Sequence, residues 1–279
     1  MKVACLGPKG SFTSGVVSQL FPNGDISYMS TYRGCQALKN QEVSFAVYPL
    51  ENNLGGFVFD TLKSIYSTSK ISIAKIETVK IEQNLIGNVS NIEEIKEIHS
   101  HPQAIAQCQN AIRNIESKIG REIKIVKVGS TSEAIIEASK EKDIVAIGSK
   151  EGAKLYGVPI IKESFQDKSI NETRFAVFKI GSPTQNLDNY KTMFLIEIDS
   201  LTEGLSQIIN LVDSLSIDIS SLSHYPISNK KSLWRYAFFL EVEGNILSKP
   251  IKILHKVLTK KKLYSQSRKA RLIGSYYCH

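Results

Sequence analysis

The side chains best suited to chemistry are hydroxyls and amides in short loops that follow apolar segments. Gly, Ser, Thr and Asn recur at residues 7–13, 52–53, 129–131 and 148–149, each soon after an apolar run. In α/β sheets, ligands bind outside the carboxyl ends of the strands. A helix that begins in such a loop offers free backbone N–H groups to an anion. Together the loops predict a site for a small anion, although each one alone also fits a cap or a turn.

Other familiar catalytic arrangements are not evident in the sequence. Residues 7–13 lack the Gly-Lys-Ser/Thr ending of a phosphate-binding P-loop. His99 and His101 lack the ligand spacing of a zinc site, and no Ser-His-Asp set is evident. Taken one at a time, these motifs therefore assign no metal centre, phosphate site or catalytic triad.

The composition is that of an ordinary globular protein. The chain has 279 residues, 42% of them hydrophobic and 22% charged, and this length favours two domains. No apolar run approaches the roughly 20 residues needed to cross a bilayer, and the first residues do not resemble a signal peptide. We therefore predict a cytoplasmic protein with no membrane association. Scattered cysteines agree with this, because they favour buried free thiols: Cys5, Cys35, Cys108 and Cys278.

The formal net charge of +8 raises the question of a nucleic-acid partner. The densest basic stretch, residues 260–271, has little aromatic interleaving and no nucleic-acid motif around it. We interpret this stretch as a solvated loop and predict no binding of nucleic acid. A basic balance also suits a small acidic substrate.

Up to about residue 180, apolar runs alternate with helix-like segments. The predicted strands are residues 3–6, 44–48, 123–126 and 144–147. One predicted helix places its apolar residues on a single face: Ala104, Ile105, Cys108, Ala111, Ile112 and Ile115. Residues 130–133 fit a capping box that opens another helix. This alternation predicts a layered α/β fold.

Residues 181–186 have the composition of a linker, and a different pattern follows them. The strand-like runs are residues 193–198, 217–222, 236–242 and 271–276. One helix between them should bury Leu205, Ile208, Ile209, Val212 and Leu215, and a second should cover residues 250–258. The resulting β-α-β-β-α-β order predicts a ferredoxin-like domain.

In chain order, the loop motifs resemble those of the prephenate dehydratase family. The matching segments are residues 6–13, 49–53, 100–107, 130–131 and 166–175. The Thr-Arg-Phe triplet at residues 173–175 is the best-known signature of that family. Near the C-terminus, residues 233–239 and 273–276 resemble the family's ACT domain. The resemblance therefore spans nearly the whole chain.

This resemblance implies a fold, an assembly and an effector. A two-lobed α/β catalytic domain, similar to periplasmic binding proteins, would span residues 1–181. A ferredoxin-like βαββαβ ACT regulatory domain would follow at residues 189–279. The ACT domain implies a homodimer or homotetramer, and L-phenylalanine as the allosteric effector.

The resemblance also implies a reaction. Prephenate would lose its ring carboxylate as CO2 and its C4 hydroxyl as water, giving phenylpyruvate for L-phenylalanine biosynthesis. This carbon–oxygen lyase would need no metal or organic cofactor. Two alternatives stay open: an arogenate dehydratase, with the same chemistry on the aminated substrate, and a non-catalytic protein that binds prephenate or an amino acid.

By the same resemblance, Thr173 is the catalytic residue and donates a hydrogen bond to the leaving hydroxyl. Arg174 offers a bidentate fork for a substrate carboxylate. The other implied substrate-binding residues are Asn52, Ser100, Gln107, Thr131, Ser11, Thr13 and Glu51. A helix that begins near Pro102 would aim Gln107 at the crevice.

The sequence departs from the family pattern at the predicted regulatory site. The family's Glu-Ser-Arg-Pro motif aligns with residues 223–226, where only Pro226 is retained beside His224. The Gly-Ala-Leu motif corresponds to Gly204-Leu205-Ser206. The implied regulatory residues are therefore Gly204, Leu205, His224 and Pro226, and the identity of the effector stays open. Asn53 stands where the family usually has Ser.

Overall fold

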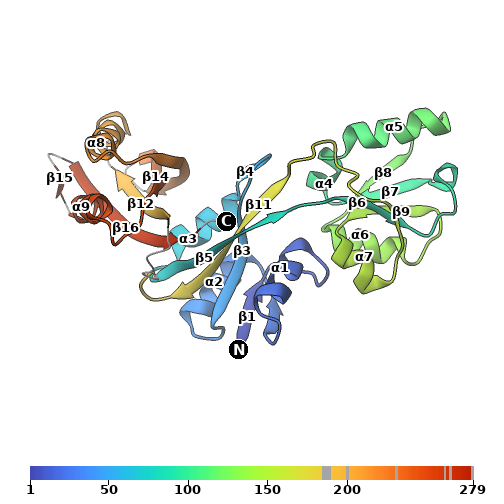
Figure 1. Cartoon of the computed structure of the whole chain (residues 1–279), viewed down its shortest axis with the longest axis horizontal. Coiled ribbons are helices and arrows are strands. Elements are labelled where there is room, and N and C mark those ends of the chain that lie inside the picture. The colour runs from blue at the N-terminus through green and yellow to red at the C-terminus, as the bar shows by residue number, and fades with distance from the viewer. Residues whose placement is uncertain (184–189, 199–200, 230–231, 261, 264–265, 278–279) are drawn as a thin grey trace.

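The computed structural model describes residues 1–183, 190–198, 201–229, 232–260, 262–263 and 266–277. The first lobe lies between the second lobe and a C-terminal domain (Figure 1). Cys278 and residues 184–186 of the predicted linker lie outside the described residues. Within these ranges, no helix is long and apolar enough to span a membrane.

The first lobe is a mixed sheet with three helices. Its strands are β1 (Lys2–Cys5), β2 (Asp25–Tyr28), β3 (Phe45–Asn52), β4 (Gly56–Phe57), β5 (Ile71–Lys80) and β11 (Glu172–Ile180). Its helices are α1 (Phe12–Leu20), α2 (Thr31–Lys39) and α3 (Phe59–Ser67). The strand order is β5-β11-β3-β1-β2, with β11 antiparallel to both of its neighbours. Strand β11 therefore returns late in the chain to lie beside β3.

The second lobe is inserted between β5 and β11. Its sheet has the order β10-β6-β9-β7-β8. The strands are β6 (Asn84–Gly87), β7 (Glu97–Ser100), β8 (Lys124–Lys127), β9 (Ile144–Gly148) and β10 (Ile160–Lys162). The helices are η1 (Ile92–Glu94), α4 (Pro102–Ala106), α5 (Gln109–Ile119), α6 (Thr131–Ala138) and α7 (Lys150–Tyr156). The chain therefore crosses between the lobes twice, once after β5 and once before β11 (Figure 1).

The single helix predicted over residues 104–115 is two helices in the structure, α4 and α5. The predicted apolar face is correct, because its residues pack in one core of the second lobe. The helix breaks at Gln107 and Cys108, where the carboxylate of Asp167 accepts the backbone N–H groups of Asn110 and Ala111 at 3.0 and 2.9 Å. A carboxylate from a distant loop thus caps a new helix start.

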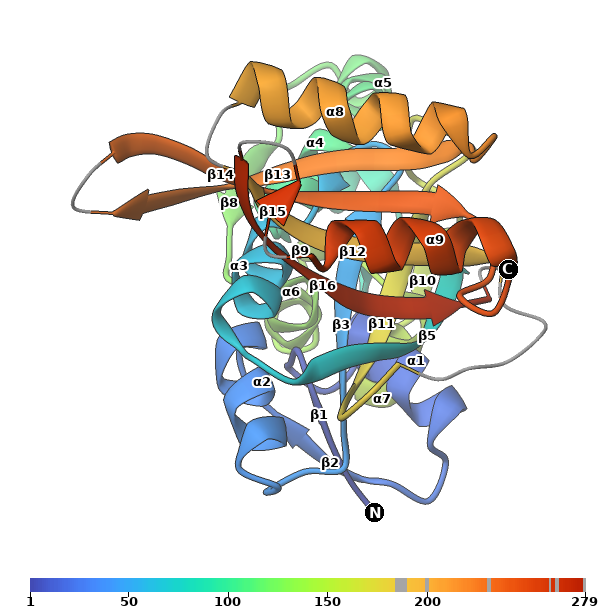
Figure 2. The same cartoon turned by 90° about the vertical axis from the view of Figure 1, so that its left-hand side faces the viewer.

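The C-terminal domain has the predicted ferredoxin-like order. It contains β12 (Lys191–Ile198), α8 (Leu201–Ser214), β13 (Ile219–Asn229), β14 (Ser232–Glu243), α9 (Lys249–Leu258), β15 (Lys262–Leu263) and β16 (Gln266–Tyr276). The sheet order is β13-β14-β12-β16. Both α8 and α9 lie in front of this sheet in Figure 2. Of the predicted α8 face, Ile209 is the exception, because it is exposed.

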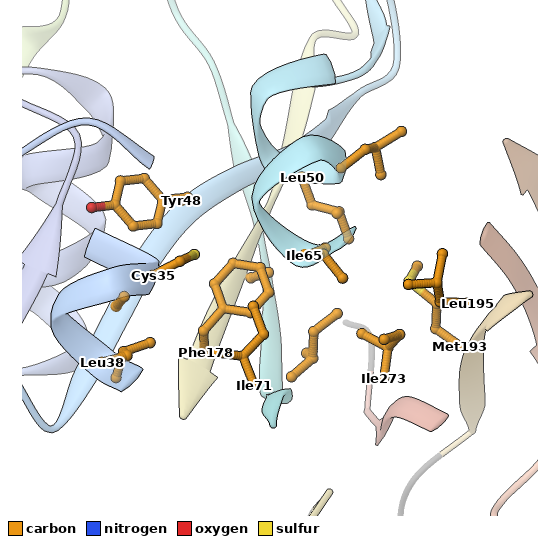
Figure 3. Close-up of a cluster of buried hydrophobic side chains, with 14 of the residues drawn as sticks. Cys35, Leu38, Tyr48, Leu50, Ile65, Ile71, Phe178, Met193, Leu195 and Ile273 are labelled. Atoms are coloured by element: carbon orange, nitrogen blue, oxygen red, sulfur yellow. The ribbon is translucent and has the colours of Figure 1, made fainter. Parts of the chain in front are cut away.

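The opposite face of the C-terminal sheet packs on the first lobe. Met193, Leu195 and Ile273 share one buried cluster with Ile65 and Ile71 of the first lobe (Figure 3). The two sheets also join, because β16 pairs in parallel with β5. The pairing residue is Gly274, where a Cβ atom would lie 2.9 Å from the Cβ of Ile73. Glycine therefore permits the close approach that makes one eleven-stranded sheet.

The basic stretch at residues 260–271 is not the predicted solvated loop. Most of its described residues belong to β15 and β16. The Arg271 guanidinium donates to the carbonyl oxygens of Ile65 and of Thr68, the latter at 2.9 Å. These carbonyls lie at the C-terminal end of α3, where a cation is favourable. Arg271 thus connects the C-terminal domain to the first lobe by hydrogen bonds.

Candidate functional site

A cleft of about 360 Å³ lies between the two lobes. Among the described residues that line it there is no Asp, Glu, Lys or Arg. Residues of the first lobe and its crossing strands in the lining are Leu6, Gly7, Ser11, Phe12, Thr13, Pro49, Asn52, Val58, Ile81, Gln83, Thr173 and Phe175. Residues of the second lobe are His101, Gln103, Ala104, Gln107, Gly129, Ser130 and Thr131. The cleft is thus neutral, with amide and hydroxyl groups on apolar walls.

Asn52, at the end of β3, has a fixed amide orientation. Its Oδ1 accepts the backbone N–H groups of Leu54 and Gly55, both at 3.0 Å. A backbone N–H can only donate, so this oxygen cannot exchange places with the Nδ2 group. The Nδ2 group therefore faces Asn171 Oδ1 at 2.8 Å and Thr173 Oγ1 at 3.0 Å. The turn after β3 thereby decides which group faces Thr173.

Thr173 lies opposite Asn52 in the β11–β3 ladder and is nearly buried, with 7% of its surface exposed. Its hydroxyl oxygen accepts a hydrogen bond from Asn52 Nδ2. A hydroxyl that accepts through oxygen still has one proton to donate. Because Thr173 also lines the cleft, this proton is available to a bound ligand. The arrangement thus leaves Thr173 able to donate a hydrogen bond into the cleft.

A chain of amides continues from Asn52 along the cleft. The buried Asn171 donates its Nδ2 group to Gln107 Oε1 at 3.1 Å, and Gln83 Nε2 donates to the same oxygen at 3.1 Å. With the orientation of Asn52 fixed, each following amide has only one consistent orientation. Gln107 therefore uses its oxygen within this chain. Its Nε2 group has no partner within the described ranges and remains for a ligand.

The N-terminus of α6 forms the second-lobe side of the cleft. Ser130 caps the helix by accepting the N–H of Glu133 at 3.0 Å, and Glu133 Oε2 accepts the N–H of Gly129 at 2.8 Å. This confirms Ser130 as the cap, whereas Glu133 reaches the residue before the cap instead of the Ser130 N–H that a capping box would use. Thr131, the first residue of the helix, lines the cleft. The positive end of the helix dipole therefore faces a prospective anion.

The N-terminus of α1 forms the corresponding side of the first lobe. Ser11 caps α1 by accepting the N–H of Ser14 at 3.2 Å, and Thr13 lines the cleft in the first turn. The loop before α1 touches the second lobe, because Ser149 Oγ donates to the Gly10 carbonyl at 2.8 Å. Two helix N-termini from different lobes thus face one cleft, which suits a ligand with two carboxylates.

Three predicted site residues lie outside the cleft lining: Ser100, Glu51 and Arg174. Ser100 is fully buried and donates to the Ile147 carbonyl at 2.7 Å. Glu51 and Arg174 lie outside the cleft because successive side chains of a strand alternate between the faces of a sheet. With Asn52 and Thr173 on the cleft side, Glu51 and Arg174 point to the opposite side. There the Arg174 fork binds Glu241 and Glu51.

Some cleft residues were missed by the sequence reasoning. His101 and Gln103 belong to the segment 100–107 that resembles the family, so the motif itself could have indicated them. His101 caps α4 by accepting the N–H of Gln103 at 3.2 Å. Gln83 lies in the crossing segment between β5 and β6, where no glycine or capping pattern marks it. Only the tertiary fold brings it beside Gln107.

The predicted regulatory residues lie far along the chain, on two elements of the C-terminal domain. Gly204 and Leu205 belong to α8, and His224 and Pro226 belong to β13, the outer strand of the sheet. Gly204 is buried against Ile198, where a Cβ atom would come within 3.0 Å. His224 is exposed and stacks edge-on against Tyr236, with 5.1 Å between ring centroids.

The described cysteines are buried free thiols, as predicted: Cys5, Cys35 and Cys108. Burial raises the pKa of each thiol to about 12. A thiol with such a pKa is protonated and poorly nucleophilic at neutral pH. Within the described residues, no group of three or more His, Cys, Asp or Glu is placed to hold a metal ion.

A family model and several relatives of known function match this chain. A family model described as prephenate dehydratase matches residues 3–182. The prephenate dehydratase of Lactococcus lactis subsp. cremoris is 28% identical over 282 residues, covering 99% of this chain and 97% of the relative. That of Methanocaldococcus jannaschii is 30% identical over 247 residues, covering 85% of this chain and 86% of the relative.

A solved structure agrees at the level of the fold. The prephenate dehydratase from Arthrobacter aurescens, in complex with L-Phe, superposes with a TM-score of 0.86 at 21% identity. The match covers 99% of this chain and 89% of the other. The two-lobed α/β fold with an ACT-type C-terminal domain is therefore shared. With the family match over residues 3–182, these likenesses show that the chain belongs to the prephenate dehydratase family.

Proposed function

We propose that this chain converts prephenate into phenylpyruvate in the cleft between its lobes, with the Thr173 hydroxyl as donor to the leaving hydroxyl. The observation that carries this assignment is the hydrogen bond from Asn52 Nδ2 to Thr173 Oγ1. It uses one lone pair of the threonine oxygen and leaves the hydroxyl proton for the substrate. As a member of this family, the chain is a carbon–oxygen lyase.

The reaction asks little of the protein beyond this donor. The bond between the ring and its carboxylate breaks, CO2 leaves, and the electron pair completes the aromatic ring. The C4–O bond breaks at the same time, and the departing hydroxide takes up one proton to become water. Negative charge grows on the leaving oxygen, so a fixed donor stabilises the transition state more than the ground state.

A neutral cleft suits the loss of the ring carboxylate. A lysine or arginine beside that group would stabilise it most while it is still charged, and would therefore oppose decarboxylation. Backbone N–H groups at the starts of α1 and α6 are weaker anion partners. We assign Thr13 and Thr131, in the first turns of these helices, to the substrate carboxylates. Ser11 and Ser130 serve as the caps.

Gln83 supplies an acceptor to the same cleft. Its Oε1 atom is buried and, within the described part of the chain, has no hydrogen-bond partner. A buried acceptor of this kind favours a ligand that brings a donor. The C4 hydroxyl of prephenate is one such donor, and the ammonium group of arogenate is another. Arogenate therefore stays the second candidate substrate.

For the C-terminal domain we propose regulation and self-association. We place its start at residue 189, after a catalytic domain of residues 1–181. The Arthrobacter relative was solved with L-Phe, which supports phenylalanine as effector. Strand β13 is an outer strand of the sheet, and such edges are commonly covered by a second copy. The proposed assembly is a homodimer or homotetramer. Buried free thiols support action in the cytoplasm.

Formation of phenylpyruvate from prephenate by the purified protein tests the proposal. Prephenate and arogenate are supplied separately, each with and without L-phenylalanine. Turnover of prephenate supports the proposed reaction, and turnover of arogenate alone moves the assignment to arogenate. Binding of prephenate without turnover of either substrate would contradict catalysis. Light scattering at micromolar concentration tests self-association, which a monomer would contradict.

A further inference from the structure

A partly buried charged cluster lies behind the two strands that carry Asn52 and Thr173. Arg174 Nη1 donates to Glu51 Oε2 at 2.8 Å and to Glu241 Oε2 at 3.0 Å. Arg174 Nη2 donates to Glu241 Oε1 at 2.5 Å. Glu51 and Arg174 belong to the first lobe, whereas Glu241 belongs to β14 of the C-terminal domain. The cluster therefore joins the C-terminal domain directly to the neighbours of the two cleft residues.

Glu241 lies on the face of the C-terminal sheet that packs against the first lobe. On β14, Ala237 and Phe239 face the first lobe, and Glu241 continues the same face by the two-residue period. Its side chain is only 1% exposed. Tyr276 donates to it at 2.5 Å and Ser221 at 3.4 Å. A carboxylate in this position is thus held from its own domain and presented to Arg174.

The electrostatics keep this carboxylate ionised. Burial of Glu241 raises the pKa of its carboxyl group and is the largest single effect. Hydrogen bonds from Arg174 and Tyr276, with the charges of Arg174 and Lys191, together outweigh it, so the pKa lies below its ordinary value. Lys191 Nζ lies 4.0 Å from the carboxylate. Glu241 therefore remains a charged partner for Arg174 at neutral pH.

We propose that Glu241 is a positioning residue of the reaction, because it holds Arg174 and thereby fixes the backbone that presents Thr173 to the cleft. Strand β5 pairs regularly with β11 at this point, but the β11–β3 ladder shifts register between Arg174 and Phe175. Backbone pairing therefore does not by itself fix Arg174 against β3, the strand that carries Asn52. Arg174 clamps Glu51 as well, and Glu51 directly precedes Asn52. The donor pair in the cleft is thus held from behind by a residue of the C-terminal domain. This inference rests on the proposed function.

A purely stabilising role would not need charge at this place. A buried ion pair contributes little net stability compared with apolar side chains of similar volume. Its directional, bidentate geometry is what an apolar contact lacks. The geometry therefore favours a role in orienting Arg174 and the backbone at Thr173. Loss of that orientation should lower kcat more than it lowers stability.

The test replaces Glu241 by Gln, which keeps the shape and removes the charge. We expect kcat for phenylpyruvate formation to fall between about tenfold and hundredfold, as for small misplacements of a catalytic group. KM should change by less than about threefold, because the lost interaction acts on the transition state. The matched control is Glu243→Gln, on the same strand, where the exposed side chain contacts Ser220 at 3.5 Å. Its kcat should equal that of the wild type.

A milder variant covers the case in which Glu241→Gln does not fold. Tyr276→Phe removes one donor to Glu241 and keeps every charge, and we expect kcat to fall about threefold to tenfold. Wild-type kcat in both folded variants, or in Tyr276→Phe alone if Glu241→Gln is unfolded by circular dichroism, overturns the inference. A loss confined to the unfolding temperature overturns it too. A wild-type protein that makes no phenylpyruvate overturns the proposed function instead, before any variant is compared.

Discussion

The two faces of the β3–β11 strand pair differ sharply in character. On the cleft face, Asn52 and Thr173 meet through neutral groups, and no described lining residue is charged. On the opposite face, one residue away on each strand, Glu51 and Arg174 form a partly buried ionic cluster with Glu241. The same two strands therefore serve two purposes. Neutral groups face the cleft, and we propose that the charge behind them holds their geometry.

This difference explains why adjacent residues of the Thr-Arg-Phe triplet have different roles. The period of two along a strand sends Thr173 to the cleft and Arg174 to the domain interface. Charge at the interface is compensated by partners within the protein, so it need not be compensated by the substrate. Charge in the cleft would instead stabilise the substrate carboxylates before reaction.

The largest effect is expected when the hydrogen bond within the cleft face is reversed. In Asn52→Asp, one carboxylate oxygen can still accept the N–H groups of Leu54 and Gly55. The other can only accept, so Thr173 must donate to it rather than to the substrate. We expect kcat to fall about 100-fold to 1000-fold, measured as phenylpyruvate formation.

Asn53→Asp is the matched control for this variant. Asn53 follows Asn52 and is exposed, and its Oδ1 accepts the N–H of Glu172 at 2.9 Å. A carboxylate can keep this bond, so kcat should stay within about threefold of the wild type. Equal losses in both variants would show that added charge, rather than the direction of one hydrogen bond, causes the defect.

On the opposite face, the apolar side chains should contribute to stability and have little effect on kcat. Met193→Ala removes a fully buried side chain from the core shared by the first lobe and the C-terminal domain. The free energy of unfolding should fall by about 3 kcal/mol, measured by denaturant titration. Ile253→Ala, on α9 with 37% exposure, should cost less than about 1 kcal/mol. Two separate unfolding transitions in wild type would contradict a shared core.

The smallest expected effect is the dependence of the unfolding free energy on acidic pH through Glu241. Its folded pKa lies below the ordinary 4.5, so the unfolded chain binds more protons as the pH falls through that region. Stability from this group is present above the unfolded pKa and is lost as pH falls through the folded one. Between about pH 6 and pH 3, wild-type unfolding free energy should fall more steeply than that of Glu241→Gln. Parallel curves would show that Glu241 has an ordinary pKa.

Periodicity and turn chemistry predicted most of the fold. The ferredoxin-like order and the helix cap at Ser130 followed from local patterns, which depend on neighbours in sequence. The break between α4 and α5 did not, because its cap is Asp167, about 60 residues along the chain. Nor did the joining of two sheets at Gly274, because nothing local shows which strand a glycine will meet.

The site divides in the same way. Motif resemblance led to Thr173, Asn52 and Gln107, which the fold brings together in one amide chain through Asn171. It could not give the direction of each hydrogen bond, which depends on the turn at Leu54 and Gly55. It also assigned Arg174 to the substrate, because the competing partner, Glu241, lies 67 residues away in another domain.

The most direct measurement compares the kcat of Thr173→Ala and Thr173→Ser with that of the wild type, using prephenate. Alanine removes the donor, so we predict a fall in kcat of at least about 100-fold with KM within a few-fold. Serine keeps the hydroxyl and should retain at least about a tenth of the wild-type kcat. If Thr173→Ala retains wild-type turnover, Thr173 is not the donor to the leaving hydroxyl.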